Sequence, residues 1–202
     1  MKVADAIKER RSIRRFLDED VSSDELNKLL EAARLAPSGL NVQPWRFKLL
    51  LGKENISWLA REAVRGQRWV GGSKAVIVCC ADLGSFTEDV EKNFRILRDS
   101  GILPPEMVAG VQEFVEKTGG YSPEMLRYAA ATNCSIAITQ MMLQAVELGL
   151  GTCWIGMYDE EAVKQKCGIG DDFAVVALLA VGRPAENPAP RPRKSMEEIV
   201  LP

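Results

Sequence analysis

The chain has 202 residues, of which 47% are hydrophobic and 27% charged, and its formal net charge is -2. This length suits one domain with a buried core, and the small net charge excludes a global field that would attract nucleic acid or an anionic membrane. The sequence contains no histidine, which excludes Ser-His-Asp and Cys-His catalysis and the usual zinc hydrolase sites.

Two further features concern the compartment. Charged residues in the opening MKVADAIKERR come too early for the apolar core of a signal peptide, and no apolar run reaches the ~18–20 residues that span a bilayer. We therefore expect a cytoplasmic protein that does not enter a membrane. The five cysteines are an odd number without a CxxC pair, which favours buried, reduced thiols. Cys153 is a partial exception, because it lies in a glycine-rich turn.

In the first half of the chain, residues 3–11 form a short amphipathic segment. Ser22 and Glu25 form a capping box that begins a helix, and Pro37-Ser38-Gly39 ends it. Trp45, Phe47, Leu49 and Leu51 alternate with Arg46, Lys48 and Leu50, which predicts a half-buried strand. A second helix is predicted around residues 56–63, and the apolar run 75–80 predicts a strand covered on both faces.

The second half begins with a more polar excursion over residues 84–120, where Pro104-Pro105 separates two helices and Gly119-Gly120 closes the second. Residues 124–150 predict a long helix that is apolar over most of its circumference, and such a helix is either central or at a dimer interface. A short strand within 149–158, a helix from Asp159 to Gly168 and a buried strand over 173–181 follow. The proline-rich tail after Gly182 is predicted to be extended.

Two basic clusters suit a phosphate. Arg10–Phe16 (RRSIRRF) offers several guanidinium groups and a hydroxyl, which are charge-assisted donors, and Arg191-Pro192-Arg193 adds two more cations. The alternatives are a solvated basic face and plain solubilising charge.

Two other segments suit a flat ring. In Pro37–Trp45, Asn41 and Gln43 could bind the edge of a heterocycle, or could simply cap a turn. In Gly149–Gly156 the glycines allow the backbone to approach a flat ligand closely. This segment is not a GxGxxG motif, and Gly66–Lys74 fails the P-loop pattern because Gly72 stands at the lysine position.

Taken in order, RRSIRRF, APSGLNVQPW, GLGTCWIG and VGRP with the basic tail before SMEEIV resemble the nitroreductase superfamily. The resemblance implies a nitroreductase-like α+β fold, in which helices flank a mixed, mostly antiparallel sheet. It also implies an intertwined homodimer with FMN bound across the interface. Residues 1–202 would then be a single FMN-binding domain with a variable helical excursion at about 84–120.

The resemblance also implies roles for individual residues. Those expected at the FMN phosphate and ribityl chain are Arg10, Arg11, Ser12, Arg14, Arg191 and Arg193. Those expected at the flavin ring are Pro37, Ser38, Gly39, Asn41, Gln43, Trp154, Ile155 and Gly156. The first three of the ring set would come from the partner subunit, the two amides would shape the pocket, and the last three would bring backbone to the ring edge. Candidates for the pyrimidine edge are Arg65, Gln67 and Arg68.

By the same resemblance, NADH or NADPH would reduce the flavin, and a nitroaromatic, a quinone or a similar small electrophile would take the two electrons. Such chemistry belongs to the cofactor, so we predict no catalytic side chain and no metal. Two alternatives stay open. One is a same-fold enzyme with a lid for reductive dehalogenation or flavin cleavage, and the other is a flavin-binding module without turnover.

Overall fold

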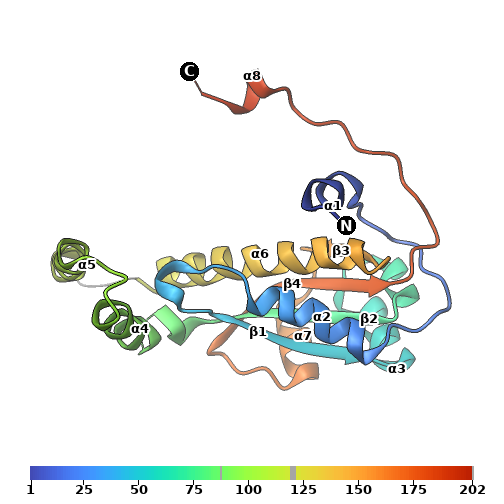
Figure 1. Ribbon diagram of the computed structural model, residues 1–202. Helices are drawn as coiled ribbons and strands as arrows, with labels where there is room; N and C mark the ends of the chain where they lie inside the picture. Colours follow the sequence, from blue (N-terminus) through green and yellow to red (C-terminus); the bar gives the residue numbers. More distant parts are fainter. Residues whose placement is uncertain (87, 119–121, 202) are drawn as a thin grey trace.

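The computed structural model describes residues 1–86, 88–118 and 122–201, so the predicted Gly119-Gly120 helix end lies outside the described residues (Figure 1). Its sheet has the order β1-β2-β4-β3, and all three neighbouring pairs are antiparallel. The strands are β1 (Trp45–Leu51), β2 (Ala75–Asp82), β3 (Gly151–Ile155) and β4 (Phe173–Gly182). Outside the named strands, a parallel bridge joins Ser12 to Thr152. The predicted α+β class with a mostly antiparallel sheet is confirmed.

The two central strands are apolar on both faces. Seven of the eight residues of β2 are buried, as expected for a strand covered on both sides. On β1, Trp45, Phe47 and Leu49 pack into one core cluster, whereas Leu50 joins the other. Leu51, which the alternation placed with the inward set, is 46% exposed. The alternation fails there because Leu51 is the last residue of β1 and belongs to neither core cluster.

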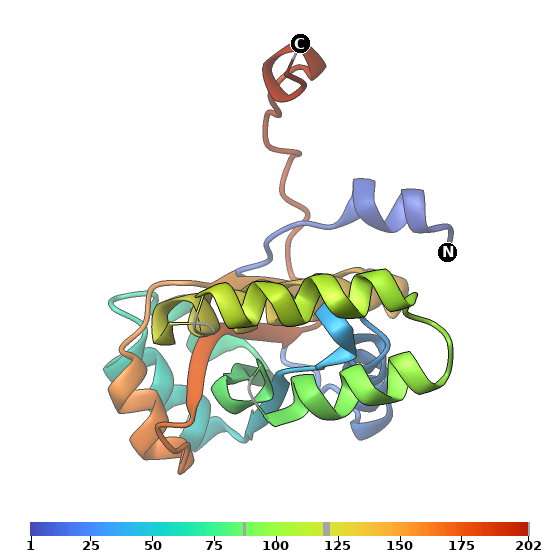
Figure 2. The ribbon, with the colours of Figure 1, turned by 90° about the vertical axis from the view of Figure 1, so that its left-hand side faces the viewer.

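Helices form a layer on each side of this sheet (Figures 1 and 2). Helices α2 and α6 cover one face, and α3 and α7 cover the other. The predicted capping box of α2 is confirmed, because Ser22 and Glu25 bond reciprocally. The helices are α1 (Val3–Glu9), α2 (Ser23–Arg34), α3 (Lys53–Trp58), α4 (Glu88–Asp99), α5 (Pro105–Thr118), α6 (Pro123–Glu147), α7 (Glu160–Cys167) and α8 (Met196–Ile199).

Helix α6 is covered on one side only. Its inward face is fully buried at Cys134, Ile138 and Met141, but its outward face leaves Thr132 and Ile136 exposed. It is therefore not a central helix within one chain, and the dimer interface is the prediction that remains.

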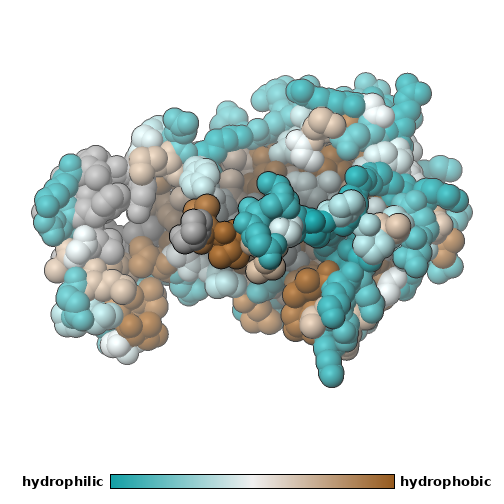
Figure 3. Space-filling model, turned by 90° about the horizontal axis from the view of Figure 1, so that it is seen from above, coloured by the Kyte–Doolittle hydropathy of each residue, from teal (hydrophilic) through white to brown (hydrophobic). Residues whose placement is uncertain are grey.

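Both ends of the chain extend away from the layered body. Helix α1 and the tail after Arg183 project beyond α6 (Figures 1 and 2). Hydrophobic side chains on these arms, among them Val3, Ile7 and Ile199, are more than half exposed. Seen from above, hydrophobic patches lie between hydrophilic ones on this side of the molecule (Figure 3). These arms therefore present apolar surface that a single chain does not cover.

Candidate functional site

The arginine segment 10–16 is held tightly against one end of the sheet. The backbone N–H of Ile13 donates to the carbonyl of Thr152 at 2.9 Å. A Cβ placed on Gly151 would lie 2.8 Å from Ile13, and one on Gly182 would lie 2.7 Å from the ring of Phe16. Only glycine at these two strand positions permits so close an approach, so β3 and β4 fix the position of the arginines.

The tail is bound to the same segment. Leu17 donates its N–H to the carbonyl of Arg183, and Ala185 donates to the carbonyl of Arg15, each at 2.9 Å. Farther along, the Nε of Arg11 donates to the carbonyl of Pro188 at 3.2 Å. These bonds hold residues 11–17 and 183–188 against each other, although the two segments are about 170 residues apart in sequence. We call this pair of segments the clasp.

The clasp encloses a basic cavity of about 330 Å³, which we call the basic cradle. Its lining includes all six of the predicted phosphate residues, and within the described chain no carboxylate lines it. The guanidinium of Arg11 already donates to the carbonyls of Lys8, Arg10 and Pro188. Its main role is therefore to form the wall of the cavity, and it has few donors left for a ligand. The lining residues of predicted function are Arg10, Arg11, Ser12, Arg14, Arg191 and Arg193.

Two residues outside the lining of the basic cradle, Trp69 and Cys153, lie near its arginines. The guanidinium of Arg14 lies 5.7 Å from the ring centre of Trp69, which is cation–π distance. Burial raises the pKa of the Cys153 thiol, while Arg14, a hydrogen bond from Ser12 and Arg10 act in the opposite direction. The thiol is buried and free, as are the other four. This confirms the prediction of buried, reduced cysteines, with Cys153 beside the arginines.

The loop 37–43 has an unusual backbone. Leu40, Asn41 and Gln43 all have positive φ values, of 48°, 55° and 47°, which non-glycine residues adopt rarely and at a cost in free energy. Inside the loop, the Oγ of Ser38 accepts the N–H of Gln43 at 3.0 Å. From α6, the Oδ1 of Asn133 accepts the N–H of Gly39 at 2.9 Å. Side-chain bonds therefore maintain a strained conformation.

Two other elements also contact this loop. Asn93 of α4 donates to the carbonyl of Asn41 at 3.1 Å. Arg46 donates to the carbonyl of Gln43 at 3.0 Å and pairs with Asp82 at 2.8 Å. The contact of Asn93 links the helical excursion to loop 37–43.

The end of β3 carries the third predicted group. Ile155 is fully buried and Trp154 packs against the core, so Ile155 could offer only its backbone to a ligand, while Gly156 is exposed. The amide of Gln67 donates to the carbonyl of Met157 at 2.8 Å. Two of the pyrimidine-edge candidates, Arg65 and Arg68, flank Gln67 and are exposed. The segment 65–69 therefore lies beside the end of β3.

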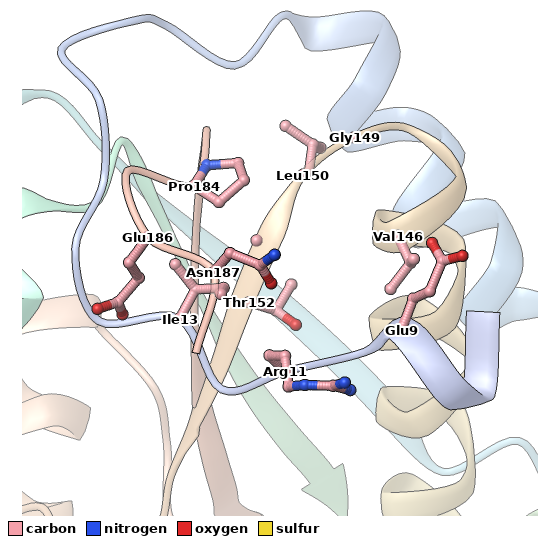
Figure 4. Close-up of a pocket in the computed structure, with 11 residues that line it drawn as sticks. Glu9, Arg11, Ile13, Val146, Gly149, Leu150, Thr152, Pro184, Glu186 and Asn187 are labelled. Atoms are coloured by element: carbon pink, nitrogen blue, oxygen red, sulfur yellow. The ribbon is translucent and has the colours of Figure 1, made fainter. Parts of the chain in front are cut away.

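The predicted site residues thus fall into two places within one chain. The loop 37–43 contacts α6 at Asn133, whereas the cavity next to the basic cradle reaches α6 at Val146 (Figure 4). These positions are about 20 Å apart at 1.5 Å rise per residue. One chain therefore brings together the arginines, the tail and the β3 end, and leaves the loop at the other end of the helix.

Comparison with known proteins places the chain. The sequence profile of the Nitroreductase family matches residues 7–183. The chain belongs to the nitroreductase family.

Two relatives and one solved structure illustrate this family. MhqN of Bacillus subtilis, provisionally named an NAD(P)H nitroreductase, is 31% identical over 96% of this chain and 95% of its own length. A protein of Thermus thermophilus named NADH dehydrogenase is 32% identical over 95% of this chain and 91% of its own. A provisionally named nitroreductase of Exiguobacterium sibiricum, solved with FMN, has a TM-score of 0.81 at 28% identity and covers 100% and 97% of the two chains. Among the described residues of this nitroreductase-family chain, no helix is long and apolar enough to cross a membrane.

Several residues that shape the site of this family member were missed by sequence reasoning. Glu186, Trp69 and Asn93 each contact a predicted site residue, but they stand in segments without a recognisable pattern. Asn133 did carry a signal, because it is an amide within the apolar stretch of the long helix. A polar side chain in an apolar stretch of a helix needs a partner where it is buried, and the half-buried Asn133 has one in the backbone of Gly39.

Proposed function

We propose that the chain is an FMN-dependent NAD(P)H oxidoreductase that passes two electrons to a nitroaromatic, a quinone or a similar small electrophile. The observation that carries the proposal is the basic cradle, which gathers five arginines from the two ends of the chain around about 330 Å³. Guanidinium groups are the donors best suited to a phosphate monoester. The residues present therefore fit the phosphate end of FMN.

When bound, the flavin would supply the chemistry by accepting hydride from NADH or NADPH and giving two electrons to the acceptor. The chain's own residues bind and orient. Arg10, Arg14, Arg191 and Arg193 would hold the phosphate, and Ser12 would offer its hydroxyl. The backbone from Trp154 to Gly156 would bring N–H and carbonyl groups to the ring edge. We assign no general acid or base, because protons can come from solvent.

The second half of the proposal is a homodimer. Loop 37–43 contacts α6 about 20 Å along the helix from the cavity that adjoins the basic cradle of its own chain, near the opposite end of α6 (Figure 1). In a second copy it would lie against the ring of a cofactor whose phosphate the first copy holds. The half-covered α6 and the apolar arms provide the surface for such a partner, since exposed apolar patches mark interaction sites.

Purification tests the proposal directly. We expect yellow protein whose released flavin has the mass of FMN, and light scattering at twice the 22.3 kDa of the chain. NADH or NADPH should bleach the flavin, and a nitroaromatic or a quinone should restore its colour. FAD as the released flavin, or a stable monomer at micromolar concentration, would contradict it. A flavin that NADH and NADPH leave oxidised would favour the non-catalytic alternative.

A further inference from the structure

Glu186 stands out in the tail because its carboxylate faces the arginine segment, yet it bonds to no arginine side chain there. Its Oε1 accepts the backbone N–H of Arg14 at 2.6 Å and that of Arg15 at 3.1 Å. It lies near Ile13, at the edge of the larger cavity that adjoins the basic cradle (Figure 4). Two consecutive N–H groups on one carboxylate oxygen fix the peptide planes on both sides of Arg14.

The position of Glu186 within the clasp explains why this contact matters. The tail is bound to the arginine segment before it by Arg183 and Ala185 and after it by Pro188. Glu186 lies between these bonds and is the member of the clasp that holds the backbone of Arg14. Arg14 is itself exposed, and its guanidinium lies over Trp69. Its direction into the basic cradle therefore depends on how its backbone is held.

We propose that Glu186 is a positioning residue for the phosphate site: its carboxylate orients the backbone of Arg14 so that the guanidinium faces the basic cradle. The inference rests on the proposed function, because it concerns how that same cradle binds the phosphate of FMN. The proposal predicts that Glu186 favours FMN binding, whereas its charge alone would predict weaker binding. A carboxylate beside an anion site repels the anion through its charge, whereas a carboxylate that organises an arginine favours binding through its geometry.

Two conservative variants separate these effects. Glu186→Gln keeps an acceptor oxygen at the same reach and removes the charge. Glu186→Asp keeps the charge and shortens the reach by one methylene, so the oxygen can no longer span both N–H groups. Positioning predicts that the Asp variant binds FMN roughly tenfold more weakly, the loss expected for one hydrogen bond to a charged group. It also predicts that the Gln variant stays within about threefold of the native chain.

Release of FMN from each purified holoprotein, followed by flavin fluorescence on dilution, gives these affinities. Riboflavin, which has no phosphate, is bound to the same proteins as the second probe, and we expect its affinity to be equal in all of them. Glu9→Ala is the matched control, since Glu9 lines the same adjoining cavity and, among described residues, makes no hydrogen bond to Arg14 or Arg15. The Glu9 variant should keep the kcat of the native chain.

Two results would overturn the inference, and a third would contradict the proposed function. Tighter FMN binding by the Gln variant with native affinity in the Asp variant would show that only charge acts, and would overturn the inference. Equal weakening for FMN and riboflavin would show a purely structural role, and would also overturn it. If the native chain binds FMN no better than riboflavin, the basic cradle is not a phosphate site, and it is the proposed function that fails.

Discussion

The basic cradle and loop 37–43 are built in opposite ways. The cradle is tied to the sheet and the tail mainly by backbone hydrogen bonds, and its anchors Ile13 and Gly151 are in close contact. The loop has three non-glycine residues with positive φ and is held by side chains from α6 and α4. At Gly39 an added Cβ would meet nothing within 4 Å. One chain therefore forms the whole lining of the cradle, whereas the loop presents an open face at Gly39.

The largest expected effect tests whether one FMN site combines the basic cradle of one chain with loop 37–43 of a second chain. We pair two defective chains by co-expression with different tags. One carries Arg14→Ala with Arg191→Ala, which disables the cradle, and the other carries Gly39→Trp, which fills the open face of the loop. Each homodimer should lose nearly all of its FMN. The mixed dimer should recover one FMN per dimer, because one of its two sites combines the intact cradle with the intact loop.

Flavin absorbance per purified mixed dimer is the measurement, and the native dimer with two FMN is the reference. If each site were built within one chain, the mixed dimer would contain two defective sites and no flavin. Such a result would contradict the proposal that the partner subunit donates loop 37–43, but not the proposal that the basic cradle binds the phosphate.

Removing one arginine from the cradle comes next in size. Arg14→Ala removes a charge-assisted hydrogen bond, a loss of about 1.5–3 kcal/mol, which corresponds to roughly 10- to 150-fold in FMN affinity. Arg15→Ala is the matched control, since Arg15 is exposed and lies outside the lining of the cradle. Fluorescence titration should show the loss for the first variant alone. Equal affinities for the two would mean that Arg14 is an ordinary surface charge.

The difference between the basic cradle and loop 37–43 also explains which features could be predicted from the sequence. The capping box at Ser22, the continuous apolar β2 and the amphipathic α2 depend on local patterns, and the structure confirms each of them. The order of motifs was enough to indicate the family. The arginines predicted as a group do lie around one cavity, and their role at a phosphate stays a prediction, because a cluster of cations serves either solvation or anion binding.

What could not be predicted depends on contacts between distant segments. No local pattern indicates that Glu186 will hold the backbone of Arg14, 172 residues earlier. The positive φ of Leu40 is also invisible, because leucine is not a residue that favours such backbone. The exposure of Leu51 and of the outward face of α6 depends on which other elements of the chain cover these surfaces, and a local sequence pattern does not state this.

A third prediction concerns the glycine that lets the arginine segment approach the sheet. In Gly151→Ala the new methyl would lie within 3.0 Å of three atoms of the buried Ile13, so Ile13 must move. Overpacking of this kind costs about 1–3 kcal/mol, and FMN affinity should fall with it because Ile13 lies within the arginine segment. Thermal unfolding and FMN titration measure the two effects. Gly72→Ala is the control, since a methyl there meets nothing within 4 Å, and a variant at Gly151 as stable as this control would refute the close packing.

The smallest effect concerns the base of the clasp, where Glu25 of the capping box pairs with Arg183 at 2.7 Å. The N–H of Ser22 is the main cause that lowers the pKa of Glu25 below its ordinary 4.5, and the Ser22 hydroxyl and Arg183 add to it against the effect of burial. Because the pKa is lower in the folded state, this contribution to stability is complete above about pH 5. It is lost as the pH falls through the lowered value.

Glu25→Gln should therefore reduce the free energy of unfolding by about 0.5–1 kcal/mol at pH 7, and the difference from the native chain should shrink below pH 4.5, the ordinary value of this carboxyl. Urea unfolding at a series of pH values measures it. Glu31→Gln on the same helix is the control, because Glu31 pairs with Arg34 in a far more exposed position, where an ion pair contributes less. Since Arg183 begins the tail, a large loss of FMN affinity in Glu25→Gln would show that the ion pair itself holds the cradle. Unchanged affinity with reduced stability would instead assign that task to the backbone bonds of the clasp, as the geometry indicates.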